Sequence, residues 1–203
     1  MENLPAIEGG KPVRKDFLVF GRPLLFREEI KEVLETLRSG WWGTGQKTKE
    51  FEKKFAKYTH SKYALALSSC TAATELALDI LGIGPGDEVI TTPLTFVSTA
   101  NVILHRRATV KFADVDLNSW NIDSKQIEKA ITKRTKAIIP VHLHGRPADL
   151  DAISKIAKVH KLFVIEDAAH AAEAWYHGKK IGSISDFTAF SFYATKNVAT
   201  GEG

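Results

Sequence analysis

Residues 162–171 read LFVIEDAAHA, and this stretch decides the fold. Its first four residues form a short apolar run with aromatic and β-branched side chains, which is typical of a buried strand. Two carboxylates follow the run directly, and small residues after them begin a new segment. Strands without polar alternation are expected where helices cover both faces of a parallel sheet. The stretch therefore predicts a buried parallel strand with Glu166 and Asp167 at its end.

The same pattern continues in both directions along the chain. Apolar runs alternate with segments of helical periodicity, as they do in βαβ units. The expected helices span residues 71–81, 96–105, 123–131 and 149–160. The expected strands span residues 63–67, 88–92, 109–115, 137–141, 162–165 and 187–193. The sequence therefore predicts an α/β fold, a three-layer sandwich with a mostly parallel central sheet.

Helical segments also precede this alternation. Residues 27–38 place apolar side chains at the spacing of an amphipathic helix, and Gly40 should end it. The glycine-rich turn WWGTG follows at 41–45, and residues 51–58 repeat the helical spacing. Farther along, Asp123 stands three residues before a glutamine, which is the spacing of a capping box.

The composition predicts a folded protein of the cytoplasm. The chain has 203 residues, 44% of them hydrophobic and 26% charged, which is enough for a core and an ordinary polar surface. The formal net charge of +4 is spread along the chain, so we expect no nucleic-acid partner. We expect no membrane span and no secretory signal, since no apolar stretch reaches about eighteen residues. The single cysteine, Cys70, excludes an intrachain disulfide and fits a reducing compartment.

In parallel α/β sheets, ligands bind beyond the carboxyl ends of the strands. The segment SSCTAA at 68–73 follows the first expected strand, and free N–H groups at the next helix start would hold an anion such as a phosphate. The alternative is plain N-capping by Ser69 or Thr71. Phe96 follows the second strand, where its ring is either a platform for a planar ligand or part of the core.

Ionisable residues follow the later strands. His142 and His144 could ligate a metal with Asp167 or His170, although we expect local hydrogen bonds and no metal. Asp167 either meets a cationic or hydrogen-bonding partner or caps the next helix, because an unpaired buried acid is costly. Lys196 follows the last apolar run and is either a desolvated nucleophile toward a carbonyl or an exposed loop residue.

Taken together, these four features suit pyridoxal 5'-phosphate. The phosphate would take the helix N-terminus, and the ring would stack on an aromatic side chain. A buried carboxylate would keep the pyridine nitrogen protonated, so that the ring can draw in electrons from a substrate carbanion. The lysine would hold the aldehyde.

The order of five motifs resembles the DegT/StrS type of sugar aminotransferase. These motifs are SCTAA at 69–73, PLTFVST at 93–99, PVHLHG at 140–145, EDAAHA at 166–171 and SFYATKNVATGEG at 191–203. The resemblance implies a pyridoxal-phosphate enzyme of fold type I. It would transfer an amino group from glutamate or glutamine to a keto-sugar, usually nucleotide-linked, or to a keto-cyclitol, in polysaccharide or antibiotic-sugar biosynthesis.

The resemblance also implies roles for single residues. Lys196 matches the Schiff-base lysine, and Asp167 matches the partner of the pyridine nitrogen. The positions that match cofactor-binding residues of the family are Thr71, Ala72, Phe96, Asp167, His170, Ser191 and Lys196. Trp42 and His144 are the expected substrate contacts, and Trp42 lies in a turn that approaches the dimer interface of relatives.

Family members run to nearly twice this length. We therefore expect an N-terminal arm over residues 1–26 and a cofactor-binding large domain over 27–203, incomplete at its C-terminal end, with the small C-terminal domain absent and the intact enzyme a homodimer. Three alternatives stay open. One is a sugar dehydratase, against which Lys196 argues because those relatives carry histidine there. The others are an inactive cofactor-binding half and a metal hydrolase that uses His142, His144 and Asp167.

Overall fold

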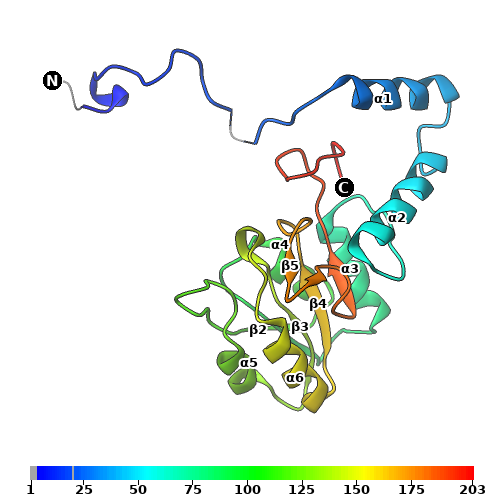
Figure 1. Ribbon diagram of the computed structural model, residues 1–203. Helices are drawn as coiled ribbons and strands as arrows, with labels where there is room; N and C mark the ends of the chain where they lie inside the picture. The colour runs from blue at the N-terminus through cyan, green and yellow to red at the C-terminus, as the bar shows by residue number, and fades with distance from the viewer. Residues whose placement is uncertain (1–3, 20) are drawn as a thin grey trace.

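A five-stranded parallel sheet forms the centre of the molecule (Figure 1). The computed structural model describes residues 4–19 and 21–203. The strands run in the order β2-β1-β3-β4-β7, and every neighbouring pair is parallel. Their bounds are β1 Glu88–Thr91, β2 Thr109–Phe112, β3 Thr135–Ile139, β4 Phe163–Asp167 and β7 Phe187–Ala189. The α/β class and the parallel sheet are confirmed.

Helices cover both faces of this sheet and make it the middle of three layers. One face packs against α3 (Cys70–Ile80) and α4 (Ser98–His105), and the other against α5 (Ser124–Ala130) and α6 (Leu150–His160). Successive strand residues point to opposite faces. The buried strand residues on the α3/α4 side include Val89, Ile139 and Ile165. Those on the α5/α6 side include Ile90, Ile138 and Val164.

The expected helix starts are confirmed to within two residues. Asp149 caps α6 by accepting a hydrogen bond from the Ala152 N–H at 3.1 Å. Asp123 caps α5 by accepting one from the Lys125 N–H at 2.9 Å. Caps of this kind contribute about 1 kcal/mol each.

Three expectations about strands are wrong. Residues 63–67 form no strand in the described structure. Instead, the Ala66 N–H donates to the Glu52 carboxylate at 2.9 Å and the Tyr63 carbonyl accepts from the Ser61 hydroxyl at 2.9 Å. The strands expected over 109–115 and 187–193 end at Phe112 and Ala189, because the chain turns away from the sheet after those residues.

A small antiparallel ribbon and two 3-10 turns were not expected. The ribbon joins β5 (Trp175–Tyr176) to β6 (Lys179–Lys180). The turns are η1 (Ala6–Glu8) and η2 (Leu143–Gly145). In the part of the chain that the structure describes, no helix combines the length and apolar character that a bilayer crossing requires.

The N-terminal region extends away from this body (Figure 1). The arm expected over 1–26 includes residues 1–3 and 20, which lie outside the described residues, and its described part is almost wholly exposed. Helix α1 (Arg27–Ser39) follows, and Gly40 ends it in the left-handed region at φ 72°. None of the described elements covers its apolar stripe: Ile30, Val33, Leu34 and Leu37 are 45%, 58%, 42% and 52% exposed.

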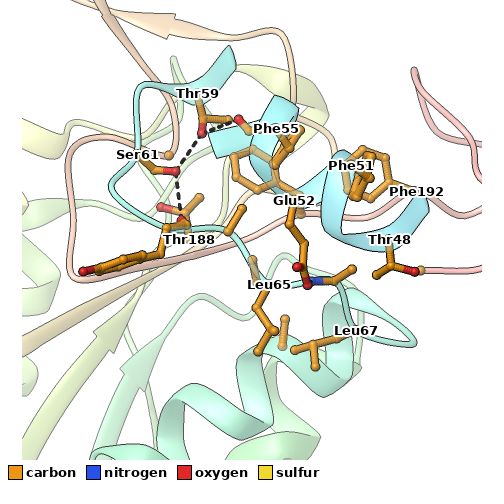
Figure 2. Close-up of a pocket in the computed structure, with 18 of the residues that line it drawn as sticks. Thr48, Phe51, Glu52, Phe55, Thr59, Ser61, Leu65, Leu67, Thr188 and Phe192 are labelled. Atoms are coloured by element: carbon orange, nitrogen blue, oxygen red, sulfur yellow. Dashed lines mark hydrogen bonds between the residues drawn. The ribbon is translucent and has the colours of Figure 1, made fainter. Parts of the chain in front are cut away.

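A large apolar groove lies between α2 (Gln46–Thr59), α3 and the outer edge of β7. Its volume is about 1190 Å³. Phe51 and Phe192 meet edge to face with ring centroids 5.2 Å apart. Figure 2 shows Phe51, Phe55 and Phe192 on one side of the groove, with Leu65 and Leu67 on the other. Among the described residues, β7 has a strand neighbour on one side alone.

These uncovered apolar surfaces predict self-association. We expect dimers or larger species in size-exclusion chromatography with light scattering, because exposed strand edges and apolar patches drive association. The double substitution Val33→Lys with Leu37→Lys should lower the mass at equal concentration. Glu28→Lys adds the same two units of charge on the polar side of α1 and should leave the mass unchanged. A monodisperse monomer in the unsubstituted chain would contradict this prediction.

Candidate active site

Asp167 is a buried carboxylate at the carboxyl end of β4. It shares the α3/α4 face with Ile165 and is 7% exposed. Its Oδ2 accepts a hydrogen bond from the Thr99 hydroxyl at 2.8 Å, and its Oδ1 accepts one from the Ala169 N–H at 3.2 Å. The Cys70 sulfur lies 3.9 Å from Oδ1. The hydrogen-bonding partner that a buried acid requires is therefore present.

Two helices begin beside this carboxylate. Cys70 is the first residue of α3 and Thr99 the second of α4. The positive ends of both helix dipoles therefore face Asp167 and stabilise its charge. Burial first, and then the charge of Asp167, raise the pKa of the Cys70 thiol far above its usual value. Cys70 is therefore a protonated thiol at neutral pH.

The start of α3 carries the expected N-cap and also leaves main-chain N–H groups without a partner in the described structure. Ser69 caps the helix, because its Oγ accepts from the Ala72 N–H at 3.0 Å. The Ala73 N–H donates to the Ser69 carbonyl at 3.0 Å. The N–H groups of Cys70 and Thr71 make no hydrogen bond within the described structure. The donors that remain for an anion are thus those of Cys70 and Thr71, while that of Ala72 is already engaged.

Phe96 presents its ring to solvent. It stands between β1 and α4, and 76% of the residue is exposed. The alternative that Phe96 belongs to the core is therefore wrong. Its carbonyl accepts a hydrogen bond from the Thr99 N–H at 3.1 Å, and the Thr99 side chain contacts Asp167, so the backbone of Phe96 is linked to the site through Thr99.

The segment that carries Lys196 folds back on itself. The Lys196 N–H donates to the Tyr193 carbonyl at 2.8 Å, and the Phe192 N–H donates to the Gly203 carbonyl at 2.7 Å. Lys196 is half-buried, so it is not the freely exposed loop lysine of the alternative reading. Its positive charge acts on both Cys70 and His170. Ser191 is buried at the start of this segment.

His144 and His170 form a parallel pair next to Lys196. Their ring centroids are 6.1 Å apart and their planes differ by 9°. Together with Gly145, Glu173, Ala174 and Asn197 they line a pocket of about 430 Å³. His144 adopts a left-handed conformation at φ 52°, which is strained for a residue with a Cβ.

Two further residues fix the loop that carries His144. A Cβ on Gly145 (φ 83°) would lie 2.8 Å from the His170 carbonyl oxygen, so the close approach of the two segments requires glycine. Asn121 is buried, donates to the Arg146 carbonyl at 3.0 Å and accepts from the Leu143 N–H at 3.0 Å. No local sequence signal marks Asn121, because its partners lie more than twenty residues away.

His142 belongs to a separate buried cluster on the α5/α6 side. Its Nδ1 accepts from the Ala148 N–H at 3.1 Å, so Nε2 carries the proton and donates to Glu166 at 2.6 Å. The Thr188 hydroxyl donates to the other oxygen of Glu166 at 3.2 Å. Both His142 nitrogens are engaged, which removes His142 as a metal ligand. Within the described residues, no three His, Cys, Asp or Glu side chains are grouped to hold a metal.

Trp42 is not brought to this cluster. It is 74% exposed in the turn between α1 and α2, and its indole N–H donates to the Leu37 carbonyl at 3.1 Å. It lines the apolar groove instead. The structure therefore gathers Asp167, Cys70 and Thr99 in one place and His144, His170 and Lys196 beside them, whereas Trp42 lies on another wall.

Comparison with known proteins identifies the family and the fold. A family model described as the DegT/DnrJ/EryC1/StrS aminotransferase family matches residues 24–203. The chain is 58% identical over 190 residues to the spore coat polysaccharide biosynthesis protein SpsC of Bacillus subtilis, which covers 94% of this chain and 49% of that protein.

Solved structures show the same fold. Spr1654 from Streptococcus pneumoniae, in its PLP and PMP forms, has a TM-score of 0.88 and 40% identity, over 92% of this chain and 51% of that chain. PseC of Helicobacter pylori, an aminotransferase involved in the biosynthesis of pseudoaminic acid, has a TM-score of 0.86 and 35% identity, over 91% and 50%. The chain thus spans about half the length of the relatives it matches.

The surroundings of His170 predict its titration. Burial first, then the charges of Lys196 and His144, lower its pKa from 6.5, and Asp167 opposes them. A lowered folded-state pKa means that the unfolded chain binds more protons just below pH 6.5, so stability falls as the pH drops through this range. We expect a ring-proton NMR midpoint below 6.5. Lys196→Gln should raise the midpoint without reaching 6.5, because burial remains.

Lys158→Gln, on the exposed side of α6, is the matched control for the loss of one positive charge, and it should leave the His170 midpoint unchanged. An equal shift in both variants would show that Lys196 does not act locally on His170.

Proposed function

The chain belongs to the DegT/DnrJ/EryC1/StrS aminotransferase family, and on that premise we propose that it forms the cofactor-binding half of a pyridoxal-phosphate-dependent sugar aminotransferase. One observation carries the proposal. The buried Asp167 carboxylate lies where two helices begin, the exposed Phe96 stands just before one of these helices, and the charge of Lys196 acts on the neighbouring Cys70. An anion, a stacking surface and an amine in one place are what this cofactor requires.

The residues present fit the cofactor. Its phosphate suits the N–H groups of Cys70 and Thr71 and the nearby hydroxyls of Thr71 and Ser191, because helix N-termini bind such anions. The Ala72 N–H would join them by exchanging its bond to Ser69. The expected cofactor contacts of the family thus fall on groups whose chemistry matches their roles.

The remaining contacts concern the ring. The exposed face of Phe96 provides a surface on which a planar ring can stack, and His170 is a second ring at the other side of the site. The Asp167 carboxylate would hold a proton on the pyridine nitrogen.

When bound, pyridoxal phosphate supplies an electron sink for the carbanion left by loss of the substrate α-proton. The residues of this chain do the rest. Lys196 Nζ would hold the cofactor covalently until the amino donor replaces it. The freed amine would then take the proton from the donor's α-carbon and return it as a general acid. Asp167 would keep its charge throughout, since Thr99 and Ala169 continue to donate to it.

We extend the proposal to substrates and assembly. Glutamate or glutamine would be the donor, and a keto-sugar, nucleotide-linked in the usual case, or a keto-cyclitol would accept the amino group. The names of SpsC and PseC, which refer to polysaccharide and pseudoaminic acid biosynthesis, support a sugar acceptor. His144 in the small pocket and Trp42 on the groove would contact substrate. A homodimer fits the uncovered apolar surfaces, and a single cysteine fits the reducing cytoplasm.

The domain plan is part of this proposal. Residues 27–203 would form the large domain and the preceding arm would contact a second subunit. Lys196 favours an aminotransferase over a dehydratase.

Covalent capture of the cofactor tests Lys196. Mixing pyridoxal phosphate with the folded chain should give a visible absorption band, and borohydride should fix the label on Lys196 alone. Lys196→Ala should abolish the band, whereas Lys158→Ala, at an exposed position, should leave it intact. Peptide mapping that finds the label on another lysine would refute the assignment.

Asp167→Asn tests the electron-sink role. A neutral amide cannot keep the pyridine nitrogen protonated, so the half-reaction with glutamate should slow by at least about a hundredfold, within the range of a lost electrostatic partner. Circular dichroism and most cofactor binding should be retained. Asp151→Asn, an exposed carboxylate on α6, is the control. An unchanged half-reaction in Asp167→Asn would remove Asp167 from the mechanism.

A further inference from the structure

Thr99 links two parts of the site. It is 1% exposed, its hydroxyl donates to Asp167 Oδ2 at 2.8 Å, and its main-chain N–H donates to the Phe96 carbonyl at 3.1 Å. We propose that Thr99 is a positioning residue, which sets where the Asp167 carboxylate lies relative to the Phe96 ring. This inference rests on the proposed function, because it gives both groups a task in holding one cofactor.

The hydrogen bonds around Thr99 have one consistent direction. Its oxygen lies 2.8 Å from the Thr95 hydroxyl and 3.1 Å from the Phe96 carbonyl, as well as near Asp167. A hydroxyl carries a single hydrogen, and bonds to an ionised acceptor are about twice as strong as neutral ones. Thr99 therefore donates to Asp167, and Thr95 donates to Thr99.

Because these groups are buried, water cannot replace the hydrogen bond that the Thr99 hydroxyl makes. Thr99 is closed to solvent and Asp167 is nearly so. Loss of the Thr99 hydroxyl would leave Oδ2 without its short hydrogen bond, and no water could take its place.

The two oxygens of Asp167 are held unequally. Oδ2 has the 2.8 Å bond, while Oδ1 has contacts of 3.2 Å to the Ala169 nitrogen and 3.9 Å to the Cys70 sulfur. The carboxylate is therefore anchored to α4 through Oδ2.

The substitution Thr99→Val separates the hydroxyl bond to Asp167 from the main-chain bond to Phe96. Valine has nearly the shape of threonine and keeps the main-chain N–H, so the substitution removes the hydroxyl alone. Thr99→Ser keeps a hydroxyl and is the rescue variant. Thr59→Val is the matched control, because Thr59 is equally buried and donates to the Phe55 carbonyl at 2.9 Å, on α2 away from the site.

The experiment uses pyridoxal phosphate labelled with ¹⁵N in the ring. We expect Thr99→Val to shift the ring-nitrogen resonance toward the unprotonated value and to slow the half-reaction with glutamate about tenfold, the scale of a lost hydrogen bond to a charged group. Thr99→Ser and Thr59→Val should stay within about twofold of the unsubstituted chain. If Thr99→Val fails to fold, Thr95→Val should produce a smaller shift in the same direction.

A double-mutant cycle that combines Thr99→Val with Asp167→Asn shows whether Thr99 acts through Asp167. In the Asp167→Asn background, Thr99→Val should slow the half-reaction with glutamate no further. Additive losses, or a wild-type resonance in Thr99→Val, would overturn the positioning role while cofactor capture at Lys196 in the unsubstituted chain still supports the proposed function. Absence of that capture would overturn both.

Discussion

The site depends on one constraint, the burial of an ionised carboxylate at the end of a strand inside the sheet. Asp167 is 7% exposed, so the protein itself must replace the water that would solvate its charge. Thr99 and Ala169 supply hydrogen bonds, and the starts of α3 and α4 supply positive dipole ends. The hydrogen-bond donors must reach this carboxylate. The carboxylate and the apolar core beneath the two helices therefore together fix where both helices begin.

The neighbouring carboxylate imposes a second condition on the same strand. Side chains alternate along β4, so Glu166 points to the opposite face from Asp167. There it pairs with His142 at 2.6 Å and with Thr188 at 3.2 Å, which joins the ends of β3, β4 and β7. A shift of one residue would place each carboxylate among the other's surroundings. Leaving a buried polar group without its hydrogen-bond partner costs about 1–3 kcal/mol, so polar partners as well as apolar packing specify the register.

Much of this arrangement could be predicted because its signals are local. The apolar runs that became β1, β3 and β4 are visible in windows of a few residues, and the caps at Asp123 and Asp149 precede their helices directly. The rule that ligands bind at strand ends then directed attention to Asp167 and Lys196. Phe96 shows the limit of such signals. The sequence could not tell whether its ring belongs to the core or provides a stacking surface, and only its 76% exposure in the structure excludes the core.

The features that were missed are pairings between distant segments. Thr99 and Asp167 are 68 residues apart, and Asn121 holds a loop more than twenty residues away. Residues 63–67 show the opposite error, because the sequence predicts a strand where the structure has none. Their apolar composition suits a strand, yet in the described structure they lie along the groove without pairing with a strand. A segment forms a strand only when it hydrogen-bonds to the edge of a neighbouring strand, and its own residues do not determine whether that edge is available. The pattern therefore predicts the capacity of such a segment to pair, whereas its conformation depends on what occupies the groove beside it.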